Sequence, residues 1–136
     1  MKLLNKKCLD FIVGLLEFKT IKDIQNNEYV LFKNNPLNCI DCIEDKTQFE
    51  AIENHVHICD KVNIKQYGYL KKLGNSLGKI LLHALKVTYP EKDFIVYVTL
   101  TINDSMIIRF HQIWENELLY YEKTNNSSKE LIMTFT

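Results

Sequence analysis

The alternation of side chains between residues 94 and 114 constrains the fold more than any other feature of the sequence. Apolar residues occupy the even positions from Phe94 to Ile102 and return at even positions from Met106 to Trp114, with Gln112 as the exception. Successive side chains of a strand point to opposite faces, so this period predicts an antiparallel hairpin with one apolar face. A three-residue turn at 103–105 keeps the apolar residues together, whereas a two-residue turn mixes the faces. The preferred turn pairs Ile102 with Met106, Leu100 with Ile108, Val98 with Phe110 and Phe94 with Trp114.

A long amphipathic helix is predicted just before this hairpin, over residues 67–89. Its apolar stripe has spacings of three and four and consists of Leu70, Leu73, Leu77, Ile80, Leu81, Ala84 and Leu85. Pro90 ends the helix because it lacks an N–H and disfavours the helical conformation of the preceding residue. Gly74 and Gly78 each cost about 1 kcal/mol relative to alanine in a helix. They indicate either a close approach of a neighbouring backbone or tolerated surface positions.

The 136 residues, of which 46% are apolar, suit a single domain covering 1–136. Helices are predicted at 2–19 and 46–54, and strands at 28–33, 55–62, 118–122 and 131–135. The stripe of the first helix consists of Leu4, Cys8, Phe11, Ile12, Leu15 and Leu16, and Thr47 with Glu50 matches a capping box for the second. The predicted fold class is α+β with two layers. A long amphipathic helix packs on a mainly antiparallel sheet, with additional N-terminal helices.

The composition argues against a membrane or secreted protein. Asp10 and Glu17 interrupt the apolar N-terminal run, and no stretch approaches the roughly 20 apolar residues of a membrane span. We therefore expect a cytoplasmic protein with reduced cysteines. The formal net charge is zero and Arg109 is the only arginine, which argues against a general nucleic-acid binder.

Two adjacent segments nevertheless carry opposite charge. Residues 61–86 contain six lysines and no acidic residue, and Lys65, Lys72, Lys79 and Lys86 recur every seven residues. This ladder could bind phosphates or an acidic protein surface, and it is also typical of a solvated helix face. Residues 41–60 have the opposite bias, with Lys46 as the one basic residue among Asp41, Glu44, Asp45, Glu50, Glu53 and Asp60. The acidic segment could dock on a basic partner, or it could be an ordinary solvated face.

Cysteine and histidine residues suggest a metal or redox site, but weakly. Cys39 and Cys42 form one C-x-x-C pair, and His55, His57 and Cys59 would share one face of a strand. A spacing of two along a strand separates side chains by roughly 6–7 Å, too far for all three to bind one ion without distortion. We therefore expect no cofactor and keep a small zinc-binding or redox domain as an alternative.

The odd-numbered face of the hairpin brings together Tyr97, Thr99, Arg109 and His111. Such side chains could support acid–base catalysis. However, no nucleophile with a dedicated base and no glycine-rich phosphate loop is present in the sequence. We expect a polar face that meets solvent or a partner, and no catalytic residues.

One stretch resembles a known class of proteins. It reads YPEKDFIVYVTLTINDSMIIRFHQIWENELLYYE, with a proline after a long helix, an alternating strand, an R-F-H-Q strand and a downstream glutamate. In this pattern, residues 68–122 resemble small bacterial immunity proteins of contact-dependent growth inhibition and other polymorphic toxin systems. The resemblance implies a cytoplasmic inhibitor that binds a cognate toxin domain, often a nuclease, and blocks its active site or substrate surface. It assigns no binding residues by position.

The leading hypothesis from the sequence is therefore a non-catalytic immunity protein that binds one toxin domain, one to one, without a membrane or nucleic acid. The candidate contact residues are charged or polar and are expected at the surface: Glu44, Asp45, Glu50, Glu53, Lys72, Lys79, Tyr97, Arg109 and His111. The alternative is a nucleic-acid-binding module that uses the lysine ladder.

Overall fold

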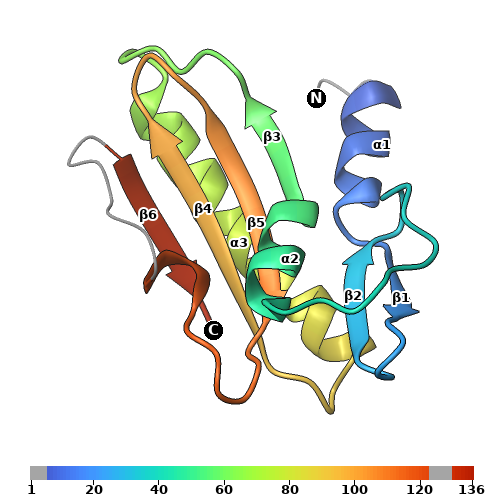
Figure 1. Cartoon of the computed structure of the whole chain (residues 1–136). Coiled ribbons are helices and arrows are strands. Elements are labelled where there is room, and N and C mark those ends of the chain that lie inside the picture. Colours follow the sequence, from blue (N-terminus) through green and yellow to red (C-terminus); the bar gives the residue numbers. More distant parts are fainter. Residues whose placement is uncertain (1–5, 123–129) are drawn as a thin grey trace.

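The computed structural model of the protein describes residues 6–122 and 130–136 (Figure 1). Within these residues three α-helices form: α1 (Lys6–Gly14), α2 (Lys46–Glu53) and α3 (Tyr67–Thr88). The strands are β1 (Phe18–Lys22), β2 (Glu28–Phe32), β3 (His55–Cys59), β4 (Phe94–Thr101), β5 (Met106–Gln112) and β6 (Glu130–Phe135), and Tyr120–Glu122 forms a short 3-10 helix, η1. The α+β class is confirmed. In this described part of the chain, no helix has both the length and the apolar character needed to cross a membrane.

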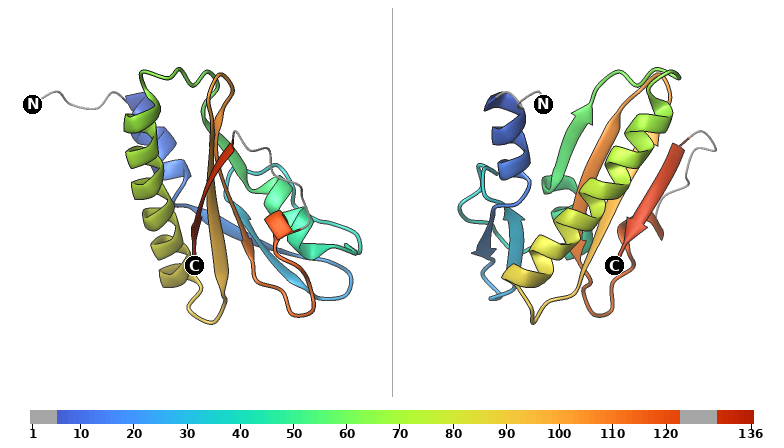
Figure 2. Two further views of the ribbon diagram at one scale, coloured as in Figure 1. Left: turned by 90° about the vertical axis from the view of Figure 1, so that its left-hand side faces the viewer. Right: turned by 180° about the vertical axis from the view of Figure 1, so that it is seen from behind.

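The main sheet has four antiparallel strands in the order β3-β5-β4-β6, and α3 lies across one of its faces (Figure 2). That face is formed by the even-numbered residues of the hairpin: Phe94, Val96, Val98, Leu100, Met106, Ile108 and Phe110. These residues pack with Leu70, Leu81 and Leu85 of α3 in one core. The predicted helix, the hairpin and the even-numbered buried face are confirmed. The predicted last strand is confirmed as β6, which pairs with β4 at the edge of the sheet.

The register predicted for the hairpin was wrong by two residues. Leu100 pairs with Met106 and Val98 with Ile108, so the turn is shifted back along the chain by one position. Asn103 adopts a φ of 64° in this turn, a conformation that asparagine tolerates better than most residues. The N–H of Asn103 also donates to the carbonyl of Val62 at 2.7 Å, which fixes the turn against the segment before α3. A shift of two leaves every side chain on its predicted face.

The two glycines of α3 mark a close approach between the helix and the sheet. A Cβ on Gly74 would lie 2.7 Å from the Met106 side chain, and a Cβ on Gly78 would lie 2.2 Å from the ring of Phe135. Both distances are shorter than real contacts of a Cβ. The sequence left open a close approach of a neighbouring backbone or tolerated surface positions for these glycines. The structure supports close packing, and the atoms that approach the helix belong to side chains of the strands, not to their backbone.

The second face of the sheet is covered as well, which the two-layer prediction missed. Figure 2 shows α3 and α2 on opposite sides of the sheet. Tyr97, Thr99 and His111 are buried on the α2 side, together with Ile95. The expected polar surface on the odd-numbered face is therefore wrong. The segment FIVYVTL is nearly continuous in apolar character, which is typical of a strand buried on both faces.

The N-terminal region differs most from the predictions. Within the described residues the first helix covers Lys6–Gly14, none of these residues is buried, and Phe18–Lys22 pairs with β2 in a separate two-stranded sheet. Leu15 is the buried member of the predicted helical stripe among the described residues, and Leu4 lies outside them. The predicted strand at 118–122 is also wrong, because η1 occupies Tyr120–Glu122.

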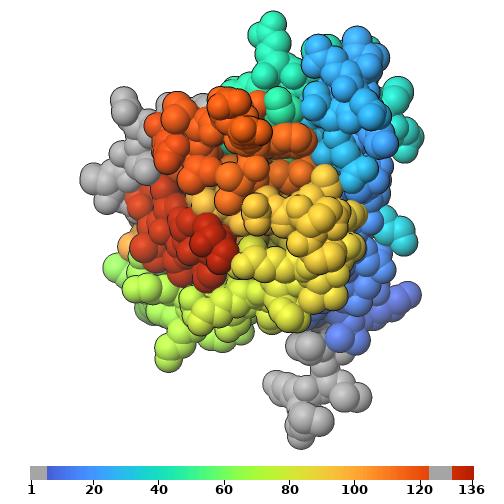
Figure 3. All heavy atoms as spheres, turned by 90° about the horizontal axis from the view of Figure 1, so that it is seen from below, coloured from blue at the N-terminus to red at the C-terminus, as the bar shows by residue number. Residues whose placement is uncertain are grey.

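The small sheet packs beside the end of the large one. Phe18 and Phe32 contact Phe110 in the main core, with ring centroids 5.8 and 4.9 Å from the Phe110 ring. From below, the loop between α3 and β4 lies beside this hairpin and the segment that follows β5 (Figure 3). Lys92 of that loop bonds to Glu28 of β2 across 3.4 Å, which closes this end of the molecule.

Candidate functional site

The charged residues predicted to contact a partner fall on two opposite faces. Lys72 and Lys79 are exposed on α3, whereas Glu44, Asp45 and Glu53 belong to α2 or to the segment that precedes it. The sheet separates α2 from α3 (Figure 2). The predicted set therefore cannot form one contact surface, and its acidic and basic members have to be considered separately.

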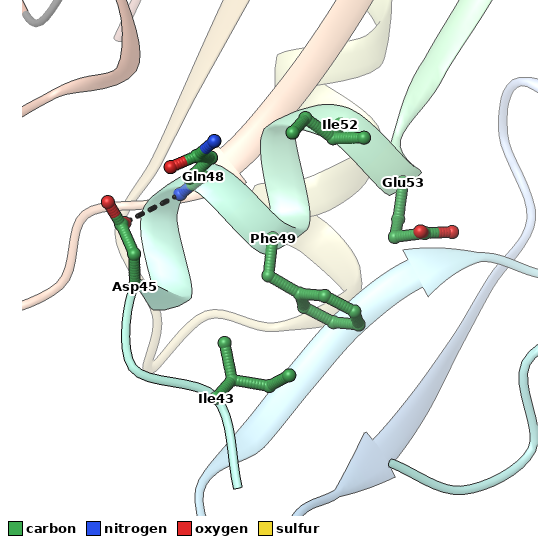
Figure 4. Close-up of a pocket in the computed structure, with 6 residues that line it drawn as sticks. All are labelled: Ile43, Asp45, Gln48, Phe49, Ile52 and Glu53. Carbon is green, nitrogen blue, oxygen red and sulfur yellow. Dashed lines mark hydrogen bonds between the residues drawn. The ribbon is translucent and has the colours of Figure 1, made fainter. Parts of the chain in front are cut away.

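A shallow hollow lies on the outer side of α2 and contains part of the acidic set. Its volume is about 290 Å³, and its lining consists of Ile43, Asp45, Gln48, Phe49, Ile52 and Glu53. Figure 4 shows the Phe49 ring between Asp45 and Glu53, with Ile43 on the side toward the preceding loop. We refer to these six residues as the acidic hollow. An apolar floor between two carboxylates is suited to a lysine or arginine side chain, whose stem is apolar and whose end is charged.

The N-terminus of α2 is firmly held, so the acidic hollow has a rigid base. Asp45 is the N-cap and accepts the N–H of Gln48 at 2.9 Å. Glu117 accepts the N–H and the hydroxyl of Thr47, each at 2.7 Å, and forms a 3.2 Å ion pair with Lys46. Burial tends to raise the pKa of Glu117, but the bonds from Thr47 and Lys46 hold it below its usual value. The charge of Lys46 is thus paired with that of Glu117.

Glu50 does not belong to this surface, contrary to the prediction. Its side chain is fully buried and accepts hydrogen bonds from the main-chain N–H groups of Val30 and Gln112, both at 2.9 Å. It also accepts the Gln112 side-chain amide at 2.8 Å and the Trp114 indole at 2.7 Å. Burial raises the pKa of Glu50 to about 7, against the opposing effect of these donors. The predicted capping box of Thr47 and Glu50 is wrong for the same reason.

Asn54, one turn after Glu50, completes the connection between the two sheets. Its side chain donates to the Val30 carbonyl at 2.8 Å and accepts the Phe32 N–H at 3.1 Å. Its main-chain carbonyl accepts the N–H of Phe110 at 3.3 Å. Side chains of α2 therefore satisfy backbone groups along facing edges of β2 and β5 that do not pair directly.

Tyr97, His111 and Arg109 also have structural partners. The Tyr97 hydroxyl lies 3.3 Å from Nε2 of His111, and both side chains are buried under the segment that follows β5. Burial raises the pKa of Tyr97 to about 12. The partly buried Arg109 donates to the Ala51 carbonyl at 3.2 Å, and its guanidinium lies 4.9 Å from the centre of the Tyr120 ring. None of the three forms the exposed contact surface that was predicted.

The structure gives no support to the zinc alternative. In the residues it describes, no group of three or more His, Cys, Asp or Glu side chains could hold a metal ion. His55 and His57 lie side by side, with ring centroids 5.5 Å apart, but each ring bonds locally, to Ile52 and Asp60. None of the four cysteines, all within the described residues, forms a disulfide.

No family model, no curated protein and no solved structure matches this chain. Sequence reasoning missed the apolar half of the acidic hollow, namely Ile43, Phe49 and Ile52. The signal in the sequence was the spacing of three residues between Phe49 and Ile52, which places both side chains on one face of a helix.

Proposed function

We propose that this protein is an immunity protein that binds one toxin domain through the acidic hollow and blocks its active site or substrate surface. The observation that carries the proposal is the apolar floor of the acidic hollow between the carboxylates of Asp45 and Glu53. A nuclease that binds a polyanion presents a basic surface, and such a surface is complementary to the acidic hollow. The resemblance of residues 68–122 to immunity proteins supports the same function.

The rim of the acidic hollow can act at a distance, and its floor can act on contact. Glu44 is exposed beside the hollow, and Glu53 is partly exposed within it. Such carboxylates attract a basic partner during approach and mainly increase the association rate. The ring of Phe49 and the exposed side chain of Ile52 then offer apolar area that a lysine or arginine stem can cover.

The decisive experiment uses the toxin domain encoded next to this protein. Cells that express that domain should survive only when this protein is co-expressed, and the purified pair should form a one-to-one complex by calorimetry. Failure to protect cells and failure to bind would both contradict the proposed function. Protection without dependence on Glu44 and Glu53 would retain the function but place the contact elsewhere.

A second candidate function rests on the lysine ladder. Lys65, Lys72, Lys79 and Lys86 are all exposed, and none takes part in a salt bridge within the described residues. A nucleic-acid-binding module would use them as phosphate contacts, and replacing the last three by alanine would flatten the salt dependence of binding. Absence of binding of the unaltered protein to RNA and DNA at low salt would exclude this candidate.

A further inference from the structure

A second hollow lies on the other side of the molecule, between α1 and α3. Its volume is about 540 Å³, and its walls carry Lys7, Cys8, Phe11 and Ile12 from α1, and Leu73 and Leu77 from α3, with Ile58 of β3 between them. We refer to this hollow as the α1–α3 cleft. Apart from Lys7, the lining residues that the structure describes carry no charged side chain.

The apolar surface of the cleft continues beyond its walls. Tyr69 and Ile80 are exposed on the same side of α3 as Leu73, because they are spaced four and seven residues from it. An exposed apolar surface of this kind on a single chain marks an interaction site.

The charge beside the cleft has one sign. The lysine ladder runs along α3 next to the exposed apolar residues, and Lys7 lines the cleft itself. Asp10 of α1 lines a different hollow, on the side of α1 toward Phe32 and Val56. An occupant with apolar side chains flanked by carboxylates would match both the lining and its surroundings.

The shape of the cleft favours a helix as that occupant. The walls are two helices and the floor is Ile58, so the surface is concave. An amphipathic helix projects a ridge of side chains at spacings of three and four, which fits a groove between helices. A bilayer surface is flat and does not enter a concavity. The acidic helix α2 of a second copy presents Ile52 as its one exposed large apolar side chain, because Ala51 is buried and Phe49 is partly buried, which is too little for a ridge of such side chains.

We propose that the α1–α3 cleft is a second docking surface, which binds an acidic amphipathic helix of a partner protein. It is separate from the acidic hollow, because α2 and α3 lie on opposite faces of the sheet. The two surfaces accept partners of opposite charge. The proposal does not depend on the proposed function, since a helix could bind here whether or not a toxin binds at α2.

The test uses a labelled helical peptide of about 15 residues, roughly 22 Å long, with leucines at spacings of three and four and glutamates elsewhere. Fluorescence anisotropy should detect binding to the full protein, and a peptide with lysines in place of the glutamates should bind at least about tenfold more weakly. Equal binding of the two peptides would overturn the charge argument. Absence of binding by the acidic peptide would overturn the proposal.

Matched variants locate the contact. Ile12→Asp, in the cleft lining, should weaken binding of the acidic peptide by about tenfold or more, since it puts a charge in the apolar contact. Val13→Asp is the control, because Val13 is the next residue of α1 and does not line the cleft. No residue of α1 is buried, so both variants should fold, which circular dichroism can verify. Equal losses in the two variants would contradict the assignment.

Other occupants give distinct results. Sedimentation of this protein with anionic vesicles, without binding of the acidic peptide, would assign the surface to lipid and overturn the proposal. Self-association that Ile12→Asp abolishes, again without peptide binding, would assign it to a second copy. Lys7→Glu should weaken binding of the acidic peptide by about threefold or more and should strengthen binding of the lysine peptide. No change in either would also count against the charge argument.

Discussion

Glu50 and Gln112 are joined by two hydrogen bonds, from the main-chain N–H of Gln112 to Oε1 at 2.9 Å and from its side-chain Nε2 to Oε2 at 2.8 Å. The same carboxylate accepts the N–H of Val30 in the small sheet and the indole N–H of Trp114. Because β2 and β5 share no ladder, this one side chain of α2 takes the place of hydrogen bonds between the sheets. Its role is to hold the small sheet against the large one.

Replacing Glu50 by glutamine should destabilise the protein. All four groups that bond to the carboxylate are N–H donors. An amide Nε2 would face two of them with a further donor, and each donor left unsatisfied in the core costs about 1–3 kcal/mol. We expect the free energy of unfolding to fall by about 2–4 kcal/mol in urea titrations at about pH 8, where Glu50 is ionised in the folded state. The matched control is Glu53→Gln on the same helix, where a partly exposed carboxylate is expected to change stability by about 0.5 kcal/mol or less.

The contribution of Glu50 to the free energy of unfolding of the unaltered protein should decrease as the pH rises from about 4.5 to 7. The pKa of Glu50 is raised from 4.5 to about 7 by burial, so the folded state holds a proton that the unfolded state releases. Its contribution is fully present below 4.5 and is lost as the pH approaches 7, at about 1.4 kcal/mol for each unit of pKa difference. The difference in unfolding free energy between the unaltered protein and Glu50→Gln, measured at several pH values, isolates this contribution.

Two other carboxylates have the opposite sign and act at lower pH. The pKa values of Asp23 and Glu117 are both lowered, because hydrogen bonds from Asn27, Tyr29 and Thr47 outweigh the effect of burial. Their contribution is present above their unfolded values, 3.8 and 4.5, and is lost as the pH falls further. The stability profile should therefore fall on both sides of a region near pH 5. A profile of Glu50→Gln that runs parallel to that of the unaltered protein between pH 5 and 7 would refute the assignment to Glu50.

Replacing Gly78 by alanine should weaken the contact between α3 and the edge strand β6. The added Cβ would lie 2.2 Å from the ring of Phe135, which must move away from the helix. Overpacking of this kind costs about 1–3 kcal/mol, more than the roughly 1 kcal/mol that alanine gains over glycine in a helix. Thermal unfolding should show a net loss of stability, and hydrogen exchange should increase in β6.

Gly68→Ala supplies the control on the same helix. Apart from its chain neighbours and the backbone of its own helix, no described atom lies within 4 Å of the position that a Cβ on Gly68 would occupy. Only the helical preference of alanine then acts, and stability should rise by about 0.5–1 kcal/mol. A gain in stability for both variants would show that the ring of Phe135 moves without loss and that the close approach at Gly78 is not required.

The elements with a clear period could be predicted from the sequence. The stripe of α3 and the alternation from Phe94 to Phe110 identify the helix, the hairpin and the face between them, because one side of each is apolar. Alternation alone does not fix register, since a shift of two residues leaves each side chain on the same face. The register is set instead by Asn103 in the turn and by its hydrogen bond to Val62. These two residues are about forty positions apart in the sequence, so no local pattern predicts their contact.

The candidate site could be predicted only in part, because burial of a polar group depends on partners that are distant in sequence. In the sequence, Glu50 lies among acidic residues that are expected at the surface, because carboxylates are seldom buried unless paired. Its donors come from β2, β5 and the residue Trp114, which no local pattern connects with it. Glu44 and Glu53 remained at the surface, while Tyr97 and His111 became core residues under η1 and the segment before it.

Charge reversal at the acidic hollow should slow association with the toxin domain in a salt-dependent way. Glu44→Lys with Glu53→Lys changes the local charge by four units without altering a buried residue, unlike any change at Glu50. At low salt we expect the association rate constant to fall by about tenfold, because electrostatic attraction acts during approach. The difference should shrink at high salt, where the screening length falls from about 10 Å at 0.1 M to about 3 Å at 1 M. Stopped-flow measurements at the two salt concentrations give both rates.

The control is Glu91→Lys in the exposed loop between α3 and β4, which should leave the rate within about twofold. An equal reduction at both salt concentrations would indicate a lost contact rather than lost attraction, and an unchanged rate would place the binding surface away from α2.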